Sequence, residues 1–159
     1  MHLYIPYLTY GCVLWSNNYE APLSELLRLQ NKAIRIINNV SLHDHITPHY
    51  VNLDLIKLPD IVKLYICQLH VLYDHLIDEK LLNYTLSLVS VSEQHNYATR
   101  SASLQHLHPS FSRINIKKFC PTVIGCYYWN DLPLSIHTVT WQQENILKKA
   151  LYQYYFAQY

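Results

Sequence analysis

The clearest pattern of hydrophobic and polar positions covers residues 21–39, APLSELLRLQNKAIRIINN. At 100° per residue, its apolar side chains gather on one face of a helix. They are Leu23, Leu26, Ala33, Ile34 and Ile37. Arg28, Lys32 and Arg35 gather on the opposite face, and Pro22 suits the first turn. We predict a helix that packs through one side and presents three cations on the other, either as a solvated face or as a stripe that contacts phosphates.

Two more helices are predicted before residue 79. A short helix follows Thr47-Pro48, Pro59 breaks the pattern, and a long helix comes after it. In the long helix, spacings of three and four residues mark one buried stripe. Its members are Ile61, Leu64, Tyr65, Gln68, Leu69, Leu72, His75 and Leu76. We expect this to be the central helix of the core.

The second half of the chain is less regular. Residues 80–99 are rich in Ser, Asn, Thr and Gln and are predicted to connect the two halves. Residues 110–119, SFSRINIKKF, alternate loosely and are a candidate short strand. The pattern as a whole predicts a mainly α fold: a bundle-like helical region, then an irregular segment with a short strand, then C-terminal helices.

Two helices are predicted near the C-terminal end. One opens at Pro121, runs through Trp129 and is closed by Pro133. The last begins at a capping box formed by Thr140 and Gln143.

Charge is distributed unevenly along the chain. Charged residues make up 14% of the 159, and the net charge of +1 hides an asymmetry. Residues 1–96 hold six Lys or Arg against nine Asp or Glu, about −3, whereas residues 97–159 hold six against two, about +4. The second half therefore carries a modest electrostatic footprint for a polyanionic partner.

Four cysteines, at 12, 67, 120 and 126, have no paired spacing, so reduced, intracellular thiols are expected, in the nucleus or in the cytoplasm. The apolar opening, MHLYIPYLTYGCVLW, lacks a basic leader and is too short to span a membrane. We expect a buried helix there and no membrane partner.

Two metal-site patterns are weighed and set aside. Pro59-Asp60 followed by Asp78-Glu79-Lys80 matches a nuclease motif, but one helix between them would hold the carboxylates about 25 Å apart. Two sets of histidines and cysteines lack the spacing of a strong zinc site. They are His43, His45 and His49, and His106, His108, Cys120 and Cys126. We expect exposed loop histidines and no cofactor.

Several short segments, taken in order, resemble the carboxy-terminal region of reverse transcriptases of non-LTR (LINE-like, jockey-type) retrotransposons. They are YGCVLWS, LLRLQNKAIRII, NLDLIKLPDIVKLYICQL, YATR and YYWNDLPLSI…ILKKALYQYY. The residues that match the family pattern are Tyr10, Gly11, Trp15, Leu29, Gln30, Ala33, Arg35, Thr99, Arg100, Trp129, Asn130, Leu132 and Pro133. The resemblance covers nearly the whole chain.

The resemblance implies a thumb and post-thumb portion: residues 1–96 as a helical thumb-like region and residues 97–159 as the segment with T-R, W-N-x-L-P and the final helix. The Y-x-D-D motif of a polymerase palm does not occur; Tyr73-Asp74-His75 is the nearest string. The paired cysteines of a zinc knuckle are missing, and no Phe adjoins Lys148-Lys149. We therefore expect no enzyme activity.

Two functions follow from these observations. In the first, the chain binds the backbone of RNA or DNA weakly and without sequence preference. The residues expected to do so are Arg28, Lys32, Arg35, Arg100, Lys117 and Lys118. In the second, it is an inert remnant of a truncated element or a helical protein-interaction module, with a reverse-transcriptase palm domain as its partner.

The corner YYWNDLPLSI, residues 127–136, is either a platform for a base or a core anchor. Asn130 can bond nearby backbone and help to end a helix, and Leu132-Pro133 turns the chain. We predict that Trp129 and Leu132 are buried anchors and that Tyr127 or Tyr128 is partly exposed.

Overall fold

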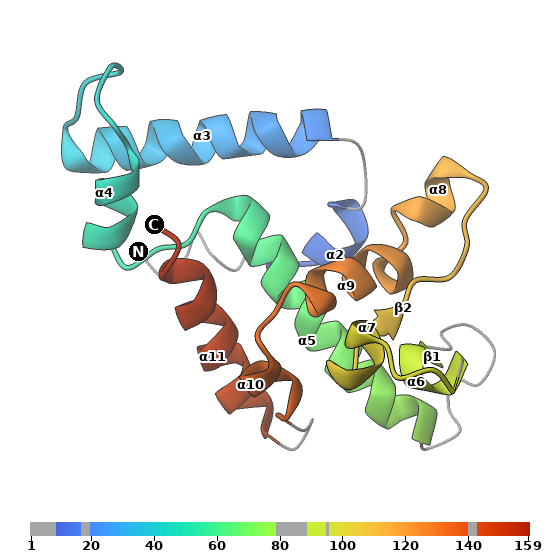
Figure 1. Ribbon diagram of the computed structural model, residues 1–159. Helices are drawn as coiled ribbons and strands as arrows, with labels where there is room; N and C mark the ends of the chain where they lie inside the picture. The colour runs from blue at the N-terminus through green and yellow to red at the C-terminus, as the bar shows by residue number, and fades with distance from the viewer. Residues whose placement is uncertain (1–8, 17–19, 79–88, 95, 140–142) are drawn as a thin grey trace. The chain divides into compact units, whose positions relative to one another are not determined.

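The computed structural model describes residues 9–16, 20–78, 89–94, 96–139 and 143–159, and these residues are mainly helical (Figure 1). The helices are α2 (Cys12–Trp15), α3 (Glu20–Asn38), α4 (Thr47–Asn52), α5 (Leu58–Asp78), α6 (Val91–Gln94), α7 (Arg100–Ser103), α8 (Asn115–Lys118), α9 (Pro121–Asn130), α10 (Leu134–His137) and α11 (Glu144–Phe156). Two short strands, β1 (Val89–Ser90) and β2 (Leu107–His108), pair antiparallel. The predicted mainly α fold is confirmed.

The chain forms two compact units. The first holds the described residues of 1–65 together with 149–159, and the second holds those of 66–148. Both α5 and α11 therefore contribute to both units. The two units are defined by contacts between residues, and their bounds differ from 1–96 and 97–159. The assignment of these two ranges to a thumb and a post-thumb region stays a prediction.

In the first unit, α3 carries the predicted helix over residues 21–38, and α4 lies at its C-terminal end (Figure 1). Asn39 directly follows α3, and its positive φ of 52° lets the N–H of Val40 reach back to the carbonyl of Arg35 at 3.0 Å. Asparagine tolerates this left-handed conformation better than most residues do. Of the predicted packing face, Ile34 is buried, but Ile37 is 57% exposed, which corrects that assignment.

The start of α5 is held by two side chains from distant parts of the sequence. The backbone N–H of Leu58 donates to Gln30 Oε1 at 2.8 Å, and that of Lys57 donates to the hydroxyl of Tyr159 at 2.5 Å. These bonds satisfy N–H groups at a helix N-terminus that have no partner inside the helix. Pro59 stands in the first turn, so the predicted break falls where the long helix begins.

Helix α5 is buried more broadly than one stripe. Ile61 and Leu64 of the predicted stripe are buried, but so are four residues outside it. These are Val62, Ile66, Cys67 and His70. A helix surrounded by packing on several sides shows no single apolar face in its sequence, which is why the periodicity named only part of its buried surface.

In the second unit, β2 lies beside α9 (Figure 1), and β1 pairs with β2, with Ser90 opposite Leu107 and Val89 opposite His108. The strand expected within residues 110–119 is not there: Asn115–Lys118 form α8 instead. The hydrogen bonds from the N–H groups of Lys117 and Lys118 to the carbonyl of Ile114 close this turn. Helix α9 opens at Pro121 and ends at Asn130, as predicted.

Helix α11 is the predicted final helix, but Thr140 of its expected capping box lies outside the described residues. The same holds for residues 80–88 of the expected connection and for most of the apolar N-terminal segment, of which α2 is described.

Candidate nucleic-acid interface

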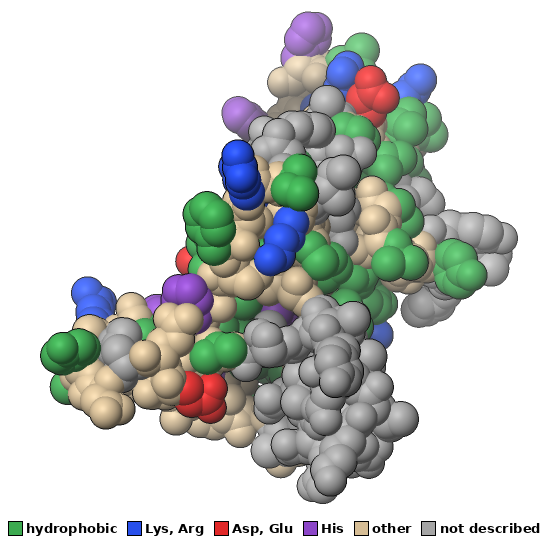
Figure 2. Space-filling model, turned by 90° about the vertical axis from the view of Figure 1, so that its right-hand side faces the viewer, with side chains coloured by type: hydrophobic (Ala, Val, Ile, Leu, Met, Phe, Trp, Pro, Cys, Tyr) green, Lys and Arg blue, Asp and Glu red, His purple; other side chains and the backbone are tan. Residues whose placement is uncertain are grey.

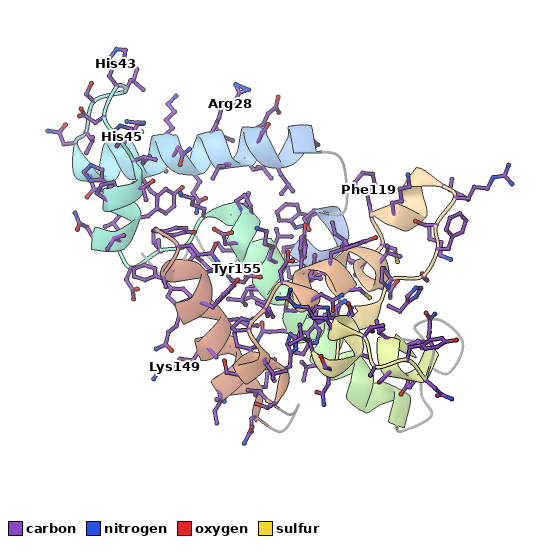
Figure 3. All side chains as sticks on the ribbon, viewed as in Figure 1. Arg28, His43, His45, Phe119, Lys149 and Tyr155 are labelled. Carbon is purple, nitrogen blue, oxygen red and sulfur yellow. The ribbon has the colours of Figure 1, made fainter. Side chains whose placement is uncertain are left out.

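The predicted cationic face of α3 is divided between two roles. Arg28 and Lys32 are exposed, and Figure 3 shows the Arg28 side chain projecting outward from the helix. Arg35 is half-buried, and its Nη1 donates a hydrogen bond to the carbonyl of Ser41 in the loop after the helix. Arg35 therefore holds the end of α3, and only the other two cations are available to a partner.

The exposed face of α3 is also not purely cationic. Glu25 is exposed three residues before Arg28, and Leu29 and Ile36 are exposed on the same side of the helix. The carboxylate lowers the positive potential that Arg28 and Lys32 would otherwise produce. The face is mixed apolar and weakly basic.

The second unit carries a longer cationic stretch. Residues 94–130 contain no Asp or Glu, and four cations in this stretch are exposed. They are Arg100, Arg113, Lys117 and Lys118. Within the part of the chain that the structure describes, none of the four takes part in an ion pair. Unpaired cations without a competing carboxylate are suited to a phosphate backbone.

Arg113 was missed among the residues predicted from the sequence, although it lies within the same acid-free stretch as Lys117 and Lys118. The local alternation of residues 110–119 was interpreted as a strand, which would have sent successive side chains to opposite faces. The segment instead enters the short helix α8. Lys117 and Lys118 therefore lie in one helical turn, and Arg113 lies just before it.

Arg100 of the T-R pair and three residues of the W-N-x-L-P corner, Asn130, Leu132 and Pro133, line one pocket of about 330 Å³. Its lining residues are Arg100, Ser101, Leu104, His106, Asn130, Leu132, Pro133, Leu134 and His137. Thr99 positions this site because its Oγ1 accepts a hydrogen bond from the N–H of Ala102 at 3.3 Å and caps α7. Arg100 is the first residue of that helix. The pocket thus brings together motif residues that lie about 30 positions apart in the sequence.

Trp129 is a buried anchor at this corner, as predicted. It is 8% exposed, and its ring stacks on His137 with centroids 4.9 Å apart. His137 Nε2 donates to the carbonyl of Trp129 at 2.8 Å, because a carbonyl oxygen only accepts. Leu132 is also buried, whereas Tyr127 is 56% exposed. A base therefore has no access to the face of Trp129.

Asn130 acts over a longer range than predicted. Its Oδ1 accepts from the N–H of Leu107 at 2.8 Å, and its Nδ2 donates to the carbonyl of the same residue at 2.9 Å. The carboxamide thus pairs with β2 as a neighbouring strand would. The partner expected for Asn130 was nearby backbone, and the structure corrects this to backbone 23 residues away.

Gln30 of the LQ-x-x-A-x-R pattern has the same role in the first unit. It is 2% exposed, accepts from the N–H of Leu58, and donates from Nε2 to the carbonyl of Ile56 at 3.1 Å. In each unit a carboxamide, buried at Gln30 and partly buried at Asn130, therefore completes the backbone hydrogen bonds of a segment far away in sequence. Gln30 is thereby closed to a ligand, whereas Asn130 still lines the pocket.

The Tyr-Gly-x-x-x-Trp segment also forms a local structure. Gly11 adopts a positive φ of 60° before α2, and the indole N–H of Trp15 donates to the carbonyl of Tyr10 at 2.9 Å. The left-handed conformation favours glycine at this position. The Tyr10 ring is exposed.

The histidines of the first zinc pattern lie in a loop and in a short helix, and the two aspartates of the nuclease pattern lie in one long helix. His43 and His45 are exposed on the loop between α3 and α4 (Figure 3), and His49 is on α4. Among the described residues, no group of three His, Cys, Asp or Glu side chains is arranged to hold a metal ion. Asp60 and Asp78 lie in the single helix α5, about 27 Å apart at 1.5 Å per residue.

Burial governs the ionisation of several side chains in both units. Desolvation raises the pKa of the Cys126 thiol to about 11, which leaves it protonated and unreactive at neutral pH. It also raises the pKa of Tyr152 to about 12, with a further contribution from Asp54, which the Tyr152 hydroxyl contacts. Both shifts follow from the packing around these groups.

Comparison with family models, with curated proteins and with solved structures finds no match for this chain. No helix among the described residues is long and apolar enough to cross a membrane.

Proposed function

We propose that this chain is a non-catalytic nucleic-acid-binding segment that resembles the carboxy-terminal, thumb and post-thumb region of a non-LTR retrotransposon reverse transcriptase. The observation that carries the proposal is the acid-free stretch of residues 94–130 with its exposed cations Arg100, Arg113, Lys117 and Lys118. On the face of the molecule in Figure 2, Lys and Arg side chains lie next to hydrophobic ones. The ligand is the sugar–phosphate backbone of RNA or DNA.

Binding of this kind is weak and tolerant of sequence. Lysine and arginine contacts to phosphates fix position and carry no base information. With about four such contacts, the affinity falls in the non-specific range, roughly 10⁻⁴ to 10⁻⁶ M at physiological salt. Arg28 and Lys32 on α3 add a second, weaker patch, because Glu25 and exposed apolar residues interrupt it.

A second candidate function rests on a different observation. Leu29, Ile36, Ile37 and Leu42 are exposed on α3 and the loop after it. Such a surface suits a helical protein-interaction module, with a reverse-transcriptase palm domain as the proposed partner. An inert remnant of a truncated element would leave this surface without a partner.

The test measures binding of a fluorescent 20-nucleotide RNA by anisotropy between 20 and 300 mM salt. We expect a log–log slope that decreases in magnitude by about 0.7 for each phosphate contact removed. The first variant changes Arg100, Arg113, Lys117 and Lys118 to Gln, and the second changes Arg28 and Lys32 to Gln. The four-residue variant should lose most of the slope and the α3 variant a smaller part.

The matched control is Lys63→Gln. The Lys63 ammonium lies 3.6 Å from an oxygen of Asp60 and 5.9 Å from the centroid of the Tyr155 ring, so its charge is already partnered. Its loss should leave the slope unchanged. If the four-residue variant also leaves the slope unchanged, the cations are only a solvated surface and the proposal is wrong.

A further inference from the structure

The side chain of Phe111 is 86% exposed, at the start of the cationic segment that leads into α8. Among the described residues, no ring contact covers it. The chain has no helix or strand at residues 109–114, so the ring is carried on an irregular segment. A phenylalanine left in water forgoes the stabilisation that burial would give.

The charged residues nearest to this ring in the sequence are all of one sign. Arg113, Lys117 and Lys118 are exposed within seven residues of Phe111, and the nearest acidic residues in the sequence are Glu93 and Asp131. An exposed aromatic ring among unpaired cations is the arrangement with which proteins hold single strands: the cations follow the backbone and the ring stacks on a base. Tyr127, by comparison, lies on α9 only four residues from Asp131.

We propose that Phe111 is a stacking platform for an unpaired base, so that residues 110–118 bind single-stranded nucleic acid in preference to duplex. This inference rests on the proposed backbone binding and adds the strandedness of the ligand. In a duplex, both faces of each internal base are stacked on their neighbours and closed to the ring. In a single strand, a base turns onto Phe111 while Arg113, Lys117 and Lys118 contact the flanking phosphates.

An anionic lipid surface is the competing ligand for cations beside apolar side chains. Among the side chains of residues 110–118 whose burial is described, the exposed apolar ones are Phe111 and Ile114, and α8 has four residues. A membrane-surface helix needs a much longer apolar face to bury. The ring and its cations therefore suit a base and its phosphates better than a bilayer.

The experiment compares three 12-nucleotide probes with the full chain: oligouridine, an oligomer of abasic sugar–phosphates, and a duplex. Oligouridine should bind at least about 5-fold more tightly than the abasic oligomer, and Phe111→Leu should remove this difference. Leucine keeps an apolar side chain and loses only the ring face. Phe111→Tyr should keep the difference, and the control Tyr127→Leu, which removes an exposed ring four residues from Asp131, should also keep it.

Equal affinity of the parent chain for oligouridine and the abasic oligomer would overturn the stacking proposal and leave backbone binding intact. The same holds if the duplex binds more tightly than oligouridine, or if Phe111→Leu matches the parent. Binding to phosphatidylserine vesicles that Phe111→Leu abolishes, with no effect on RNA, would assign the ring to a membrane. No binding to any of the three oligomers at low salt would overturn the proposed function as well.

Discussion

His70 on α5 and Gly125 on α9 approach so closely that a methyl group on Gly125 would lie 1.7 Å from His70 Nε2. The same ring nitrogen donates a hydrogen bond to the carbonyl of Pro121 at 3.1 Å, one turn earlier in α9. Both helices meet here inside the second unit, where His70, Gly125 and Cys126 are buried. Position 125 needs glycine because a larger side chain would overlap the His70 ring, and not because the backbone turns there.

Gly125→Ala is therefore expected to lower the free energy of unfolding by at least about 2 kcal/mol, since the added methyl group overlaps a fixed ring. Urea denaturation followed by circular dichroism measures the change. The double variant Gly125→Ala with His70→Ala removes the clashing ring. It should lose less stability than the sum of the two single variants, whereas simple additivity would show that the two residues do not compete for space.

Acid should destabilise the chain through His70. Burial lowers the pKa of His70, and the hydrogen bond to Pro121 raises it by less. Because the unfolded chain takes up this proton near pH 6.5 and the folded chain only at lower pH, the free energy of unfolding falls as pH falls below about 6.5. His70→Gln should flatten this part of the stability curve, measured by urea titration between pH 5 and 8. The control His43→Gln, on an exposed loop, should not.

Trp129→Ala should cost about 3 to 5 kcal/mol of stability, because it empties a buried site and removes the stack on His137. Thermal melting or aggregation measures this loss. Tyr127→Ala, with an exposed ring on the same helix, should change the Tm little. A Trp129 variant as stable as the parent but deficient in RNA binding would contradict the anchor role.

Gln30→Leu should cost about 2 to 5 kcal/mol. It keeps the approximate size of the side chain but leaves the N–H of Leu58 and the carbonyl of Ile56 buried without their partner. The exposed Gln153 on α11 provides the matched control, since Gln153→Leu removes no such bond. Equal chemical denaturation midpoints for the two variants would show that the carboxamide bridge does not hold α5.

The chain should extend no primer in the presence of Mg²⁺ or Mn²⁺, because the paired carboxylates of a two-metal polymerase site are missing from its sequence. Incorporation of labelled nucleotides on a primed RNA template measures this. An active reverse transcriptase serves as the positive control, and templated incorporation above the background of heat-denatured chain would contradict the prediction.

The sequence by itself determined the helices α3, α4, α5, α9 and α11 and the buried tryptophan corner. Periodicity and proline positions predicted α3, α4, α5 and α9, and a capping box predicted α11, because helix formation depends on local spacing, on where a backbone N–H is missing and on how the first turn is capped. The burial of Trp129 also followed from local context, since the Leu132-Pro133 turn that follows it indicated a corner.

Only the tertiary structure decided which polar groups are occupied and which stay accessible. Gln30 and Asn130 bind backbone 26 to 28 and 23 residues away, Arg35 holds a loop, and His70 excludes a side chain at Gly125. The tertiary structure also decided that Phe111 is exposed and that α8 forms in place of a strand. Contacts between residues far apart in sequence leave no periodic pattern, so composition and spacing could not distinguish a cation or ring used in packing from one open to a ligand.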